Sequence, residues 1–388
     1  MNPKSTPPRI LLLGPERHAV SGVATHLTVL LNSTLGRDFD LKQFTLGSEG
    51  REKGRLLRGW RLLSLVPRLL WQLLRWRPDV VHINSSLNQR AFWRDALLLL
   101  LLRPLPLQLL WQSHGGDLQH WLQQCRRFAP LVRWLLRRPD AVVVLNRHEY
   151  QSYRALQLRR LWLIPNAIDL HPFESPPVPR RHHSHWRLLY IGRLAAEKGL
   201  IELITALTIL RQQAPLLRWH CWIAGSGPLQ ALLQRQIRQP PLQGRVRLLG
   251  VVQGAAKVRL WRAADLFLFP SYHVEGLPYA TLESLASGTP LLTTAVGGNS
   301  DAVRSGREGV VIEPHQPQQW AQQLQQLLQQ PAQLRQMSAA CRLRAAEQYG
   351  VERLAWQFDA LYRELLSTHD PKTDRRAQKR VQPTTEPR

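Results

Sequence analysis

The sequence has few cysteines and no long apolar run. Its three cysteines, Cys125, Cys221 and Cys341, are scattered and lack the spacing of metal ligands. An odd number of scattered cysteines argues against a disulfide framework and favours a reducing compartment, so we expect a cytoplasmic protein. The apolar run at residues 10–13 is too short for a signal peptide. No uninterrupted apolar stretch approaches the roughly 20 residues of a membrane span.

Acidic residues are also scarce. The chain has 27 of them against 52 lysines and arginines, which gives a formal net charge of +25. Such an excess of cations predicts an anionic partner, and composition does not choose among lipid headgroups, nucleic acid and a phosphorylated acceptor. Residues 51–77 are basic, rich in leucine and tryptophan, and contain Pro67, where we expect a kink or a split. Two interpretations stay open for them, an amphipathic helix in an anionic membrane interface and a surface helix packed on a sheet.

The length of 388 residues predicts two domains, and 44% hydrophobic residues suffice for two cores. Short apolar segments that end in glycine or polar loops predict buried strands of an α/β fold with parallel sheets. We expect strands at residues 9–13, 41–46, 78–84, 105–111, 140–145, 187–191, 219–224, 245–249, 265–269 and 290–296. Residues 350–366 are expected to form a terminal helix.

Residues 265–301 hold the strongest candidate site. Two strand ends are each followed by a glycine-bearing loop and a helix start, with one helix expected at residues 278–287 and ended by Gly288. This arrangement brings free N–H groups to the carboxyl edge of one sheet, where α/β proteins bind anionic ligands. Gly297 and Gly298 lack Cβ atoms, so another group can approach their backbone closely.

Glu275 and Glu283 add two carboxylates to this stretch. Carboxylates do not hold phosphate but accept hydrogen bonds from hydroxyls, so the pair indicates a hydroxyl-rich ligand with an anionic middle, such as a nucleotide sugar. Either glutamate alone is better explained as an ordinary surface residue. The whole set of residues favours a site.

A second group of candidates follows the strand expected at residues 187–191. Arg193 and Lys198 lie in a loop that contains Gly192 and Gly199. Two cations at a strand's carboxyl end can neutralise a diphosphate and stabilise the charge that builds on it as a sugar leaves. Taken alone, this stretch would be interpreted as a simple basic loop.

The first half of the chain has weaker candidates. Gly22 lies before a helix expected to continue to residue 31, and His114 stands beside two glycines at a strand's carboxyl end. A lone glycine or histidine at such a position is often structural. Asp38 and Asp40 have the spacing of a metal-binding pair, but they precede a strand near a domain edge, and we do not expect a metal there.

The segment from Glu275-Gly276-Leu277-Pro278 through Glu283, continued by residues 286–290 and Gly297-Gly298, resembles the Glu-x7-Glu segment of retaining GT-B glycosyltransferases of family 4. The resemblance covers most of residues 9–366. It implies a GT-B fold, with two Rossmann-like domains whose parallel sheets face each other across a cleft. We expect an acceptor-side domain at 1–173, a linker at 174–185, a nucleotide-sugar domain at 186–349, a helix crossing back to the first domain at 350–366, and a disordered basic tail at 367–388.

The resemblance also implies an activity. The chain is expected to transfer a sugar, with retention and without a metal or cofactor, from a UDP- or GDP-linked donor. The acceptor would be a saccharide or a membrane-associated molecule in surface polysaccharide or glycolipid synthesis, at the inner face of the cell membrane. Arg193 and Lys198 would hold the diphosphate, Glu283 the ribose and Glu275 the sugar, and His114 would act from the other domain. The expected donor-binding residues are Gly22, Gly192, Gly225, Val251, Gly276, Leu277 and Glu283.

Two departures from the family pattern keep an alternative open. Ser21 replaces a more common glycine, and Asp301 stands where the family more often has glutamate. The alternative is a non-catalytic scaffold that binds a nucleotide sugar. A nucleic-acid-binding protein would explain the charge, but no module with base-stacking aromatic residues is visible.

Overall fold

The computed structural model describes residues 6–19, 21–46, 55–174 and 185–368, with side chains in helix α2 from residue 64 onward. The chain divides into two compact units. Unit 1 consists of Met1–Val144, Glu149–Ile164 and Glu352–Arg388, and unit 2 of Leu145–His148 and Pro165–Val351. Most of the expected linker and of the expected basic tail lies outside the described residues, so the disorder of the tail stays a prediction.

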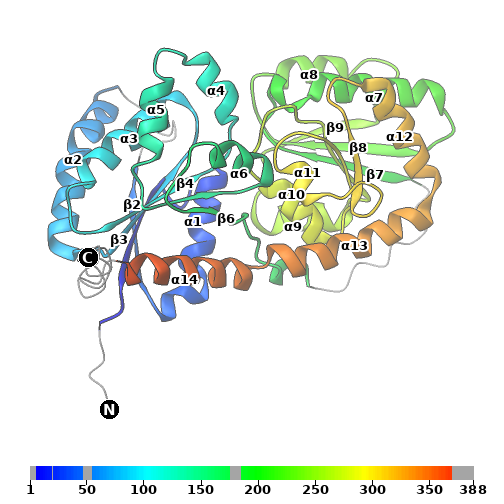
Figure 1. The fold of residues 1–388 in the computed structure, drawn as a ribbon. Coiled ribbons are helices and arrows are strands. Elements are labelled where there is room, and N and C mark those ends of the chain that lie inside the picture. Colours follow the sequence, from blue (N-terminus) through cyan, green and yellow to red (C-terminus); the bar gives the residue numbers. More distant parts are fainter. Residues whose placement is uncertain (1–5, 20, 47–54, 175–184, 369–388) are drawn as a thin grey trace, which may run out of the picture. The chain divides into compact units, whose positions relative to one another are not determined.

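Unit 1 contains a six-stranded sheet in the order β2-β1-β3-β4-β5-β6 (Figure 1). All neighbouring strands are parallel, with Ile10 of β1 opposite Val80 of β3. The strands are β1 (Arg9–Gly14), β2 (Asp40–Thr45), β3 (Val80–Ser85), β4 (Gln108–Ser113), β5 (Ala141–Val144) and β6 (Leu161–Leu163). β3 and β4 are buried along their whole length, as expected for central strands covered on both faces.

Helices cover both faces of this sheet. α2, α3 and α5 pack on one face, against alternate strand residues such as Leu11 and Val81. α1 and α14 share the other face, where the ring of His26 meets that of Phe358 at 5.9 Å. The helices of unit 1 are α1 (Gly22–Asn32), α2 (Arg55–Trp76), α3 (Gln89–Leu102), α4 (Leu118–Gln124), α5 (Ala129–Leu136), α6 (Arg147–Arg154, which starts in unit 2) and α14 (Val351–Ser367), with the 3-10 turn η1 (Thr34–Arg37). α2 is one helix with Pro67 inside it, so of the two outcomes predicted at Pro67 the split is wrong and the kink stays a prediction.

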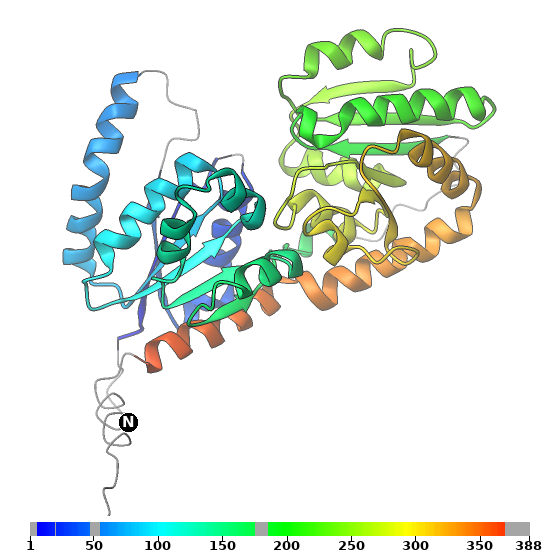
Figure 2. The ribbon, with the colours of Figure 1, turned by 45° about the horizontal axis from the view of Figure 1, so that its top comes forward.

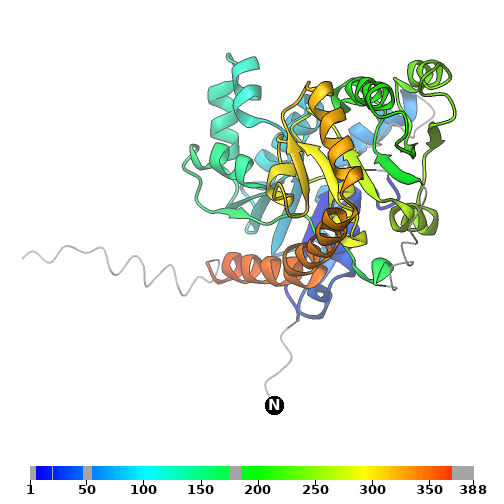
Figure 3. The same ribbon diagram turned by 90° about the vertical axis from the view of Figure 1, so that its right-hand side faces the viewer.

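The terminal helix α14 is fixed to unit 1 by a buried histidine. Nδ1 of His82 lies 2.9 Å from the Tyr362 hydroxyl, and its Nε2 lies 2.9 Å from Oε1 of Gln112. Because the amide oxygen only accepts, Nε2 carries the proton and Nδ1 accepts from Tyr362. On its other side Tyr362 packs against Phe39, close to the start of β2, and Figure 3 shows α14 (red) beside this part of the chain.

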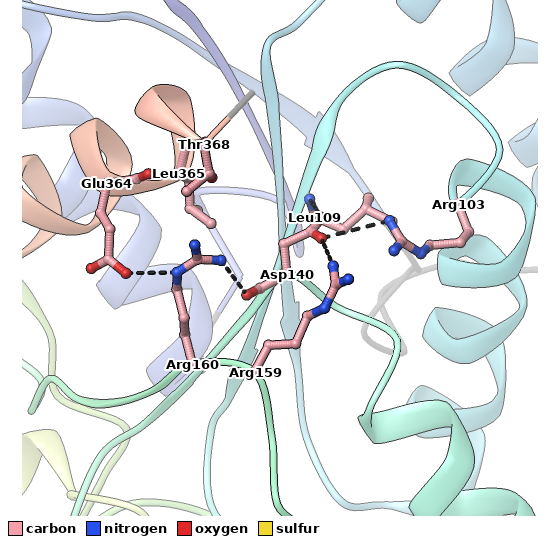
Figure 4. Close-up of polar contacts among 8 residues, drawn as sticks. All are labelled: Arg103, Leu109, Asp140, Arg159, Arg160, Glu364, Leu365 and Thr368. Carbon is pink, nitrogen blue, oxygen red and sulfur yellow. Dashed lines mark hydrogen bonds and ion pairs between the residues drawn. The ribbon is translucent and has the colours of Figure 1, made fainter. Parts of the chain in front are cut away.

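Ion pairs add to this attachment (Figure 4). Arg160, just before β6, donates to the Glu364 carboxylate at 2.6 Å and to the Asp140 carbonyl at 3.3 Å. The buried Asp140 carboxylate accepts from the Leu109 amide at 2.9 Å and pairs with Arg159 at 3.0 Å. One aspartate therefore joins β4, the start of β5 and the segment before β6, and Arg160 links this group to α14.

Unit 2 repeats the architecture with a parallel sheet in the order β12-β11-β10-β7-β8-β9. α7 and α12 pack together, as do α10 and α13. The strands are β7 (Trp186–Ile191), β8 (Trp219–Ala224), β9 (Val246–Gly250), β10 (Leu266–Phe269), β11 (Leu291–Thr294) and β12 (Gly309–Ile312). The helices are α7 (Leu200–Gln213), α8 (Gln230–Gln236), α9 (Gly254–Ala263), α10 (Tyr279–Ser287), α11 (Asn299–Ala302), α12 (Pro317–Gln329) and α13 (Pro331–Tyr349), with the 3-10 turns η2 (His171–Phe173) and η3 (Ala196–Lys198).

These two sheets confirm the predicted α/β fold with parallel sheets. The strand order in each unit has its first strand in the interior of the sheet, with the chain leaving it in both directions. In unit 2 that strand is β7, which lies between β10 and β8. Such a switch point is where loops at the carboxyl edge diverge and leave room for a ligand.

Candidate functional site

The loops after β7, β8 and β9 are joined by backbone hydrogen bonds at the carboxyl edge of the unit 2 sheet. The Gly192 amide donates to the Ala224 carbonyl at 3.0 Å, and the Gly225 amide donates to the Gly250 carbonyl at 2.7 Å. Beyond the strands, the Leu194 amide donates to the carbonyl of Ser226 at 2.9 Å. These loops therefore form one connected backbone surface, which contains the expected residues Gly192 and Gly225.

The turn that carries Lys198 is held against the end of β10. Gly199 ends η3 with φ of 67°, and a Cβ there would collide with the carbonyl oxygen of Pro270. Only glycine combines this left-handed conformation with so close an approach. The amide of Tyr272 also donates to the Glu197 carbonyl at 3.1 Å. The local sequence thus fixes Lys198 beside the loop that follows β10.

Lys198 forms an ion pair with the Glu275 carboxylate, and the two side chains are 13% and 22% exposed. Burial lowers the pKa of Lys198 to about 8; the charge of Glu197 opposes this shift, and Arg193 adds to it. Arg193 itself is 67% exposed, with its guanidinium 4.0 Å from the Glu197 carboxylate. The structure therefore brings Lys198 and Glu275 into contact and leaves Arg193 at the rim of the same loop.

The backbone of residues 275–277 is held from several directions. The Glu275 carbonyl accepts from the Gly298 amide at 3.0 Å, and a Cβ on Gly298 would collide with the Gly276 carbonyl oxygen. This close approach is the one that Gly297-Gly298 led us to expect. Nδ2 of Asn146 donates to the Gly276 carbonyl at 2.6 Å, and Nδ2 of Asn166 donates to the Leu277 carbonyl at 2.8 Å.

Glu283 lies on α10 and has partners on α9. One of its oxygens lies 2.6 Å from Nζ of Lys257, and the other accepts from Nε1 of Trp261 at 3.1 Å. Sequence reasoning missed Lys257, because nothing in its neighbourhood marks it and the pair depends on how α9 packs on α10. Val251 follows β9 with 57% of its surface exposed, at the same sheet edge.

Asp301, the residue that departs from the family pattern, has a structural role in unit 2. Its carboxylate accepts a hydrogen bond from the backbone amide of Arg147. Its carbonyl accepts from Arg344 at 2.8 Å. The Asp301 side chain, which is shorter than the glutamate common in the family, therefore has a hydrogen-bond partner in Arg147, 154 positions earlier in the sequence.

The two candidates in unit 1 have local partners. Nε2 of His114 lies 2.9 Å from Oδ1 of Asn84, and its ring meets that of His26 at 4.9 Å. Burial, with the nearby His26 and His82, lowers the pKa of His114 well below its usual value, so this imidazole is neutral. Gly22 is the first residue of α1, and the Ser21 side chain accepts from an amide of the first turn, which is the usual work of an N-cap serine. That Gly22 and His114 contact a nucleotide-sugar donor stays a prediction.

Candidate metal ligands do not gather in the part of the chain that the structure describes, where no group of three or more His, Cys, Asp or Glu side chains could hold an ion. Asp38 instead pairs with Arg363 at 3.6 Å, and Asp40 accepts from Trp76 at 3.2 Å. Among the same residues, no helix is long and apolar enough to cross a membrane.

Two solved structures share the fold. Sucrose-phosphate synthase from Thermosynechococcus elongatus superposes with a TM-score of 0.77 at 20% identity, covering 93% of this chain and 100% of the other. Anabaena HepE, solved in complex with UDP-glucose, gives a TM-score of 0.71 at 18% identity, covering 92% and 99%. At these identities the likeness concerns the fold, and it confirms the expected GT-B architecture.

Curated relatives match in sequence. Glycogen synthase of Mycobacterium tuberculosis is 30% identical over 289 residues, which is 73% of this chain and 66% of that protein. D-inositol 3-phosphate glycosyltransferase of Thermobispora bispora is 34% identical over 186 residues, 46% of this chain and 43% of the relative. The chain thus spans just under two thirds of the first relative and less than half of the second.

Two family models together match most of the chain. The model described as Glycosyltransferase Family 4 matches residues 20–172, and that described as Glycosyl transferases group 1 matches residues 174–344. The second match contains Arg193, Lys198, Glu275 and Glu283. The chain therefore belongs to the family 4 glycosyltransferases.

Proposed function

We propose that the protein is an enzyme that transfers a sugar from a nucleotide diphosphate donor with retention of configuration. The observation that carries the proposal is the contact between Lys198 and Glu275 at the carboxyl edge of the unit 2 sheet. A largely buried lysine with a lowered pKa beside a carboxylate, in a loop rich in backbone amides, is typical of a functional site. Its chemistry suits a ligand with both phosphates and hydroxyls.

The ion pair suggests an exchange of partners on donor binding. The diphosphate replaces Glu275 as the partner of Lys198, and the freed carboxylate accepts hydrogen bonds from sugar hydroxyls. As the bond between the sugar and the phosphate breaks, negative charge grows on the leaving diphosphate. Lys198 and the exposed Arg193 stabilise that charge, and this kind of stabilisation favours the transition state over the bound substrate.

Glu283 is proposed to hold the ribose. Lys257 and Trp261 fix its carboxylate, yet each oxygen keeps a lone pair that can accept from a hydroxyl. We propose a uridine nucleotide, because Anabaena HepE, which shares the fold, was solved with UDP-glucose. The base would contact the loop that contains Val251, and a GDP-linked donor is the alternative.

No protein nucleophile is proposed. The acceptor hydroxyl approaches the sugar from the side on which the diphosphate leaves: its oxygen bonds to the anomeric carbon, the bond from that carbon to the phosphate oxygen breaks, and the leaving phosphate takes the hydroxyl proton. The cations of Lys198 and Arg193 neutralise the leaving diphosphate, as a metal does in other glycosyltransferases. Neutral His114 of unit 1 gives its Nε2–H to the Asn84 side-chain oxygen, so its Nδ1 is proposed to accept a hydrogen bond from a hydroxyl of the transferred sugar. The acceptor is a saccharide or a membrane-associated molecule in surface polysaccharide or glycolipid synthesis, with the protein at the cytoplasmic face of the membrane.

The test compares donor turnover in Lys198→Ala and Glu275→Ala with the wild type and with Lys42→Ala, an exposed lysine on β2 of unit 1. UDP- and GDP-sugars are first screened by thermal shift, because a ligand that binds the native state raises its melting temperature. Hydrolysis or transfer is then measured with the best donor. Losing one transition-state contact should lower kcat by about 100-fold or more, and Lys42→Ala should not.

Two results would argue against the proposal. Activity within a few-fold of the wild type in both variants would show that the roles are wrongly assigned. Donor binding that is lost in Lys198→Ala, but never leads to turnover in the wild type with any acceptor, would favour the non-catalytic scaffold.

A further inference from the structure

Among the side chains that the structure describes, the outer sides of α2, α3 and α5 in unit 1 carry nine that are large, apolar and exposed. They are Leu70, Trp71 and Leu74 on α2, Leu97, Leu100 and Leu101 on α3, and Phe128, Leu131 and Trp134 at α5, and together we call them the outer apolar face. Their exposed fractions run from 40% for Leu100 to 78% for Leu74. Single exposed leucines are ordinary on a protein surface, but a cluster of nine large apolar side chains marks an interaction site.

Helix α3 shows most directly that this face needs a cover. Residues 97–102 are six consecutive leucines. Leu98, Leu99 and Leu102 are at most 1% exposed and pack on the sheet, so the other three point away from it. A helix that lies between the protein core and water has a polar outer side. A helix that is apolar all round is typical of a helix whose outer side is buried as well.

The three helices form one layer, so their exposed residues are neighbours. α2 connects β2 to β3, α3 connects β3 to β4, and α5 lies between β4 and β5, while β3, β4 and β5 are adjacent in the sheet. Their inner leucines belong to a single core cluster. The ring of Trp93 on α3 lies 6.0 Å from that of Phe128, and Figure 2 shows α2 and α3 side by side on this face.

Arginines surround the outer apolar face. The guanidinium of Arg138 lies 4.0 Å from the ring centre of Trp134, and that of Arg75 lies 5.7 Å from Trp71. Across residues 64–77, 89–103 and 126–138 the only carboxylate is Asp95, which is buried and bonded to Arg94 at 2.7 Å. In the described part of these helices and next to them, the exposed arginines are Arg68, Arg75, Arg77, Arg90, Arg126, Arg127, Arg133 and Arg137.

We propose that the outer apolar face docks on a membrane that contains anionic lipids. Leucine and tryptophan side chains enter the boundary between headgroups and acyl chains, and the arginines contact lipid phosphates, as in helices that lie in a membrane interface. A second copy of the chain fits less well, because two such faces would bring their arginines together without any carboxylate between them. Nucleic acid would pair with the arginines but would leave the leucines in water.

This inference adds a docking surface to the proposed membrane-associated acceptor, and its test needs neither donor nor acceptor. Flotation of the full chain is compared on vesicles of phosphatidylcholine alone and on vesicles that also contain phosphatidylglycerol. The variant carries Leu97→Gln, Leu100→Gln and Leu101→Gln. The matched control carries Leu216→Gln, Leu232→Gln and Leu343→Gln, three leucines of unit 2 that are 41–93% exposed.

The wild type and the control should float with the anionic vesicles and not with phosphatidylcholine alone. The α3 variant should bind at least about 100-fold more weakly, since it lacks three leucine side chains that the membrane would bury in the wild type. Arg133→Gln with Arg137→Gln should weaken binding as well, and serves as the second variant if the first does not fold by circular dichroism. Added salt should weaken wild-type binding.

Other outcomes would overturn the proposal. Equal binding of the wild type and the α3 variant would show that the leucines do not enter the membrane. A dimer of the wild type in sedimentation, absent in the α3 variant, together with no vesicle binding, would identify the face as an interface between copies. RNA binding that the leucine substitutions leave unchanged, again without vesicle binding, would favour nucleic acid. Because donor binding is measured separately, failure here would leave the proposed sugar transfer untouched.

Discussion

Raising the pH from about 7 to about 9 is expected to weaken UDP binding roughly 10-fold, because Lys198 loses its proton over this range. Burial lowers the pKa of Lys198 to about 8 in the free protein. A diphosphate beside the ammonium favours the charged form and raises that pKa again. Binding therefore needs a proton on Lys198, and above about pH 8 the proton must be taken from solution.

The magnitude follows from how far burial lowers the pKa of Lys198. The ordinary pKa of 10.5 falls to about 8, and each pKa unit is worth about 1.36 kcal/mol, so keeping Lys198 charged in the free protein costs about 3 kcal/mol. Because the pKa of Lys198 is lower in the folded protein than in the unfolded chain, this cost destabilises the folded protein. The cost is fully present below about pH 8 and fades as the pH rises toward 10.5. Binding a diphosphate removes the cost at neutral pH.

The assay is titration calorimetry with UDP in buffers of different ionisation enthalpy. At about pH 8, Lys198 is protonated in half of the ligand-free molecules, so binding of UDP should take up about half a proton per molecule. In Lys198→Gln the proton uptake and the pH dependence should disappear, and this variant also corrects for ionisation of the nucleotide itself. A UDP affinity that is independent of pH in the wild type, or a pH dependence that persists in Lys198→Gln, would refute the reasoning.

Three further predictions concern the scaffold. Burial lowers the pKa of His82 to about 3 from an ordinary 6.5, so the unfolded chain binds the proton first and stability falls as the pH drops below 6.5. Between about pH 7 and pH 5 this histidine should account for a loss of about 2 kcal/mol of unfolding free energy in urea, so His82→Gln should lose about that much less than the wild type. Tyr362→Phe leaves Nδ1 of His82 without its donor and should cost about 1–3 kcal/mol in the same experiment, whereas no loss would show that the hydrogen bond does not matter. Gly298→Ala drives a Cβ against the Gly276 carbonyl, and should cost about 1–3 kcal/mol and weaken UDP binding, while Gly36→Ala, which has open space, should do neither.

The sequence predicts the elements of the fold well where the signal is local. The strand expected at residues 219–224 is found there, and the helix expected at 278–287 starts one residue later and ends at Gly288. Strong apolar runs, glycine and proline carry that information within a few residues. The three-residue β6 was not predicted, because so short a strand is defined by its pairing with β5 and not by its own sequence.

The sequence predicts candidate residues for the site, whose roles stay predictions, but it does not predict how these residues pair. The carboxylates of the Glu-x7-Glu segment were recognised as a pair, yet each has its own cation in the structure, Lys198 for Glu275 and Lys257 for Glu283. These partners lie 77 and 26 positions away in the sequence, and only the packing of the loops and helices brings them together. His82 was likewise expected only as part of a strand, and its bond to Tyr362 spans 280 positions.

The placement of α14 has a consequence for synthesis. The strands of unit 1 leave the ribosome first, but α14, which covers His82 with Phe358, is made after all of unit 2. Domains fold as units once their segments have been synthesised. Unit 2 can therefore fold while unit 1 still lacks α14 and exposes the apolar surface that this helix covers. A chain stopped before residue 351 would keep that surface exposed, and a nascent chain needs protection from aggregation until α14 has been made.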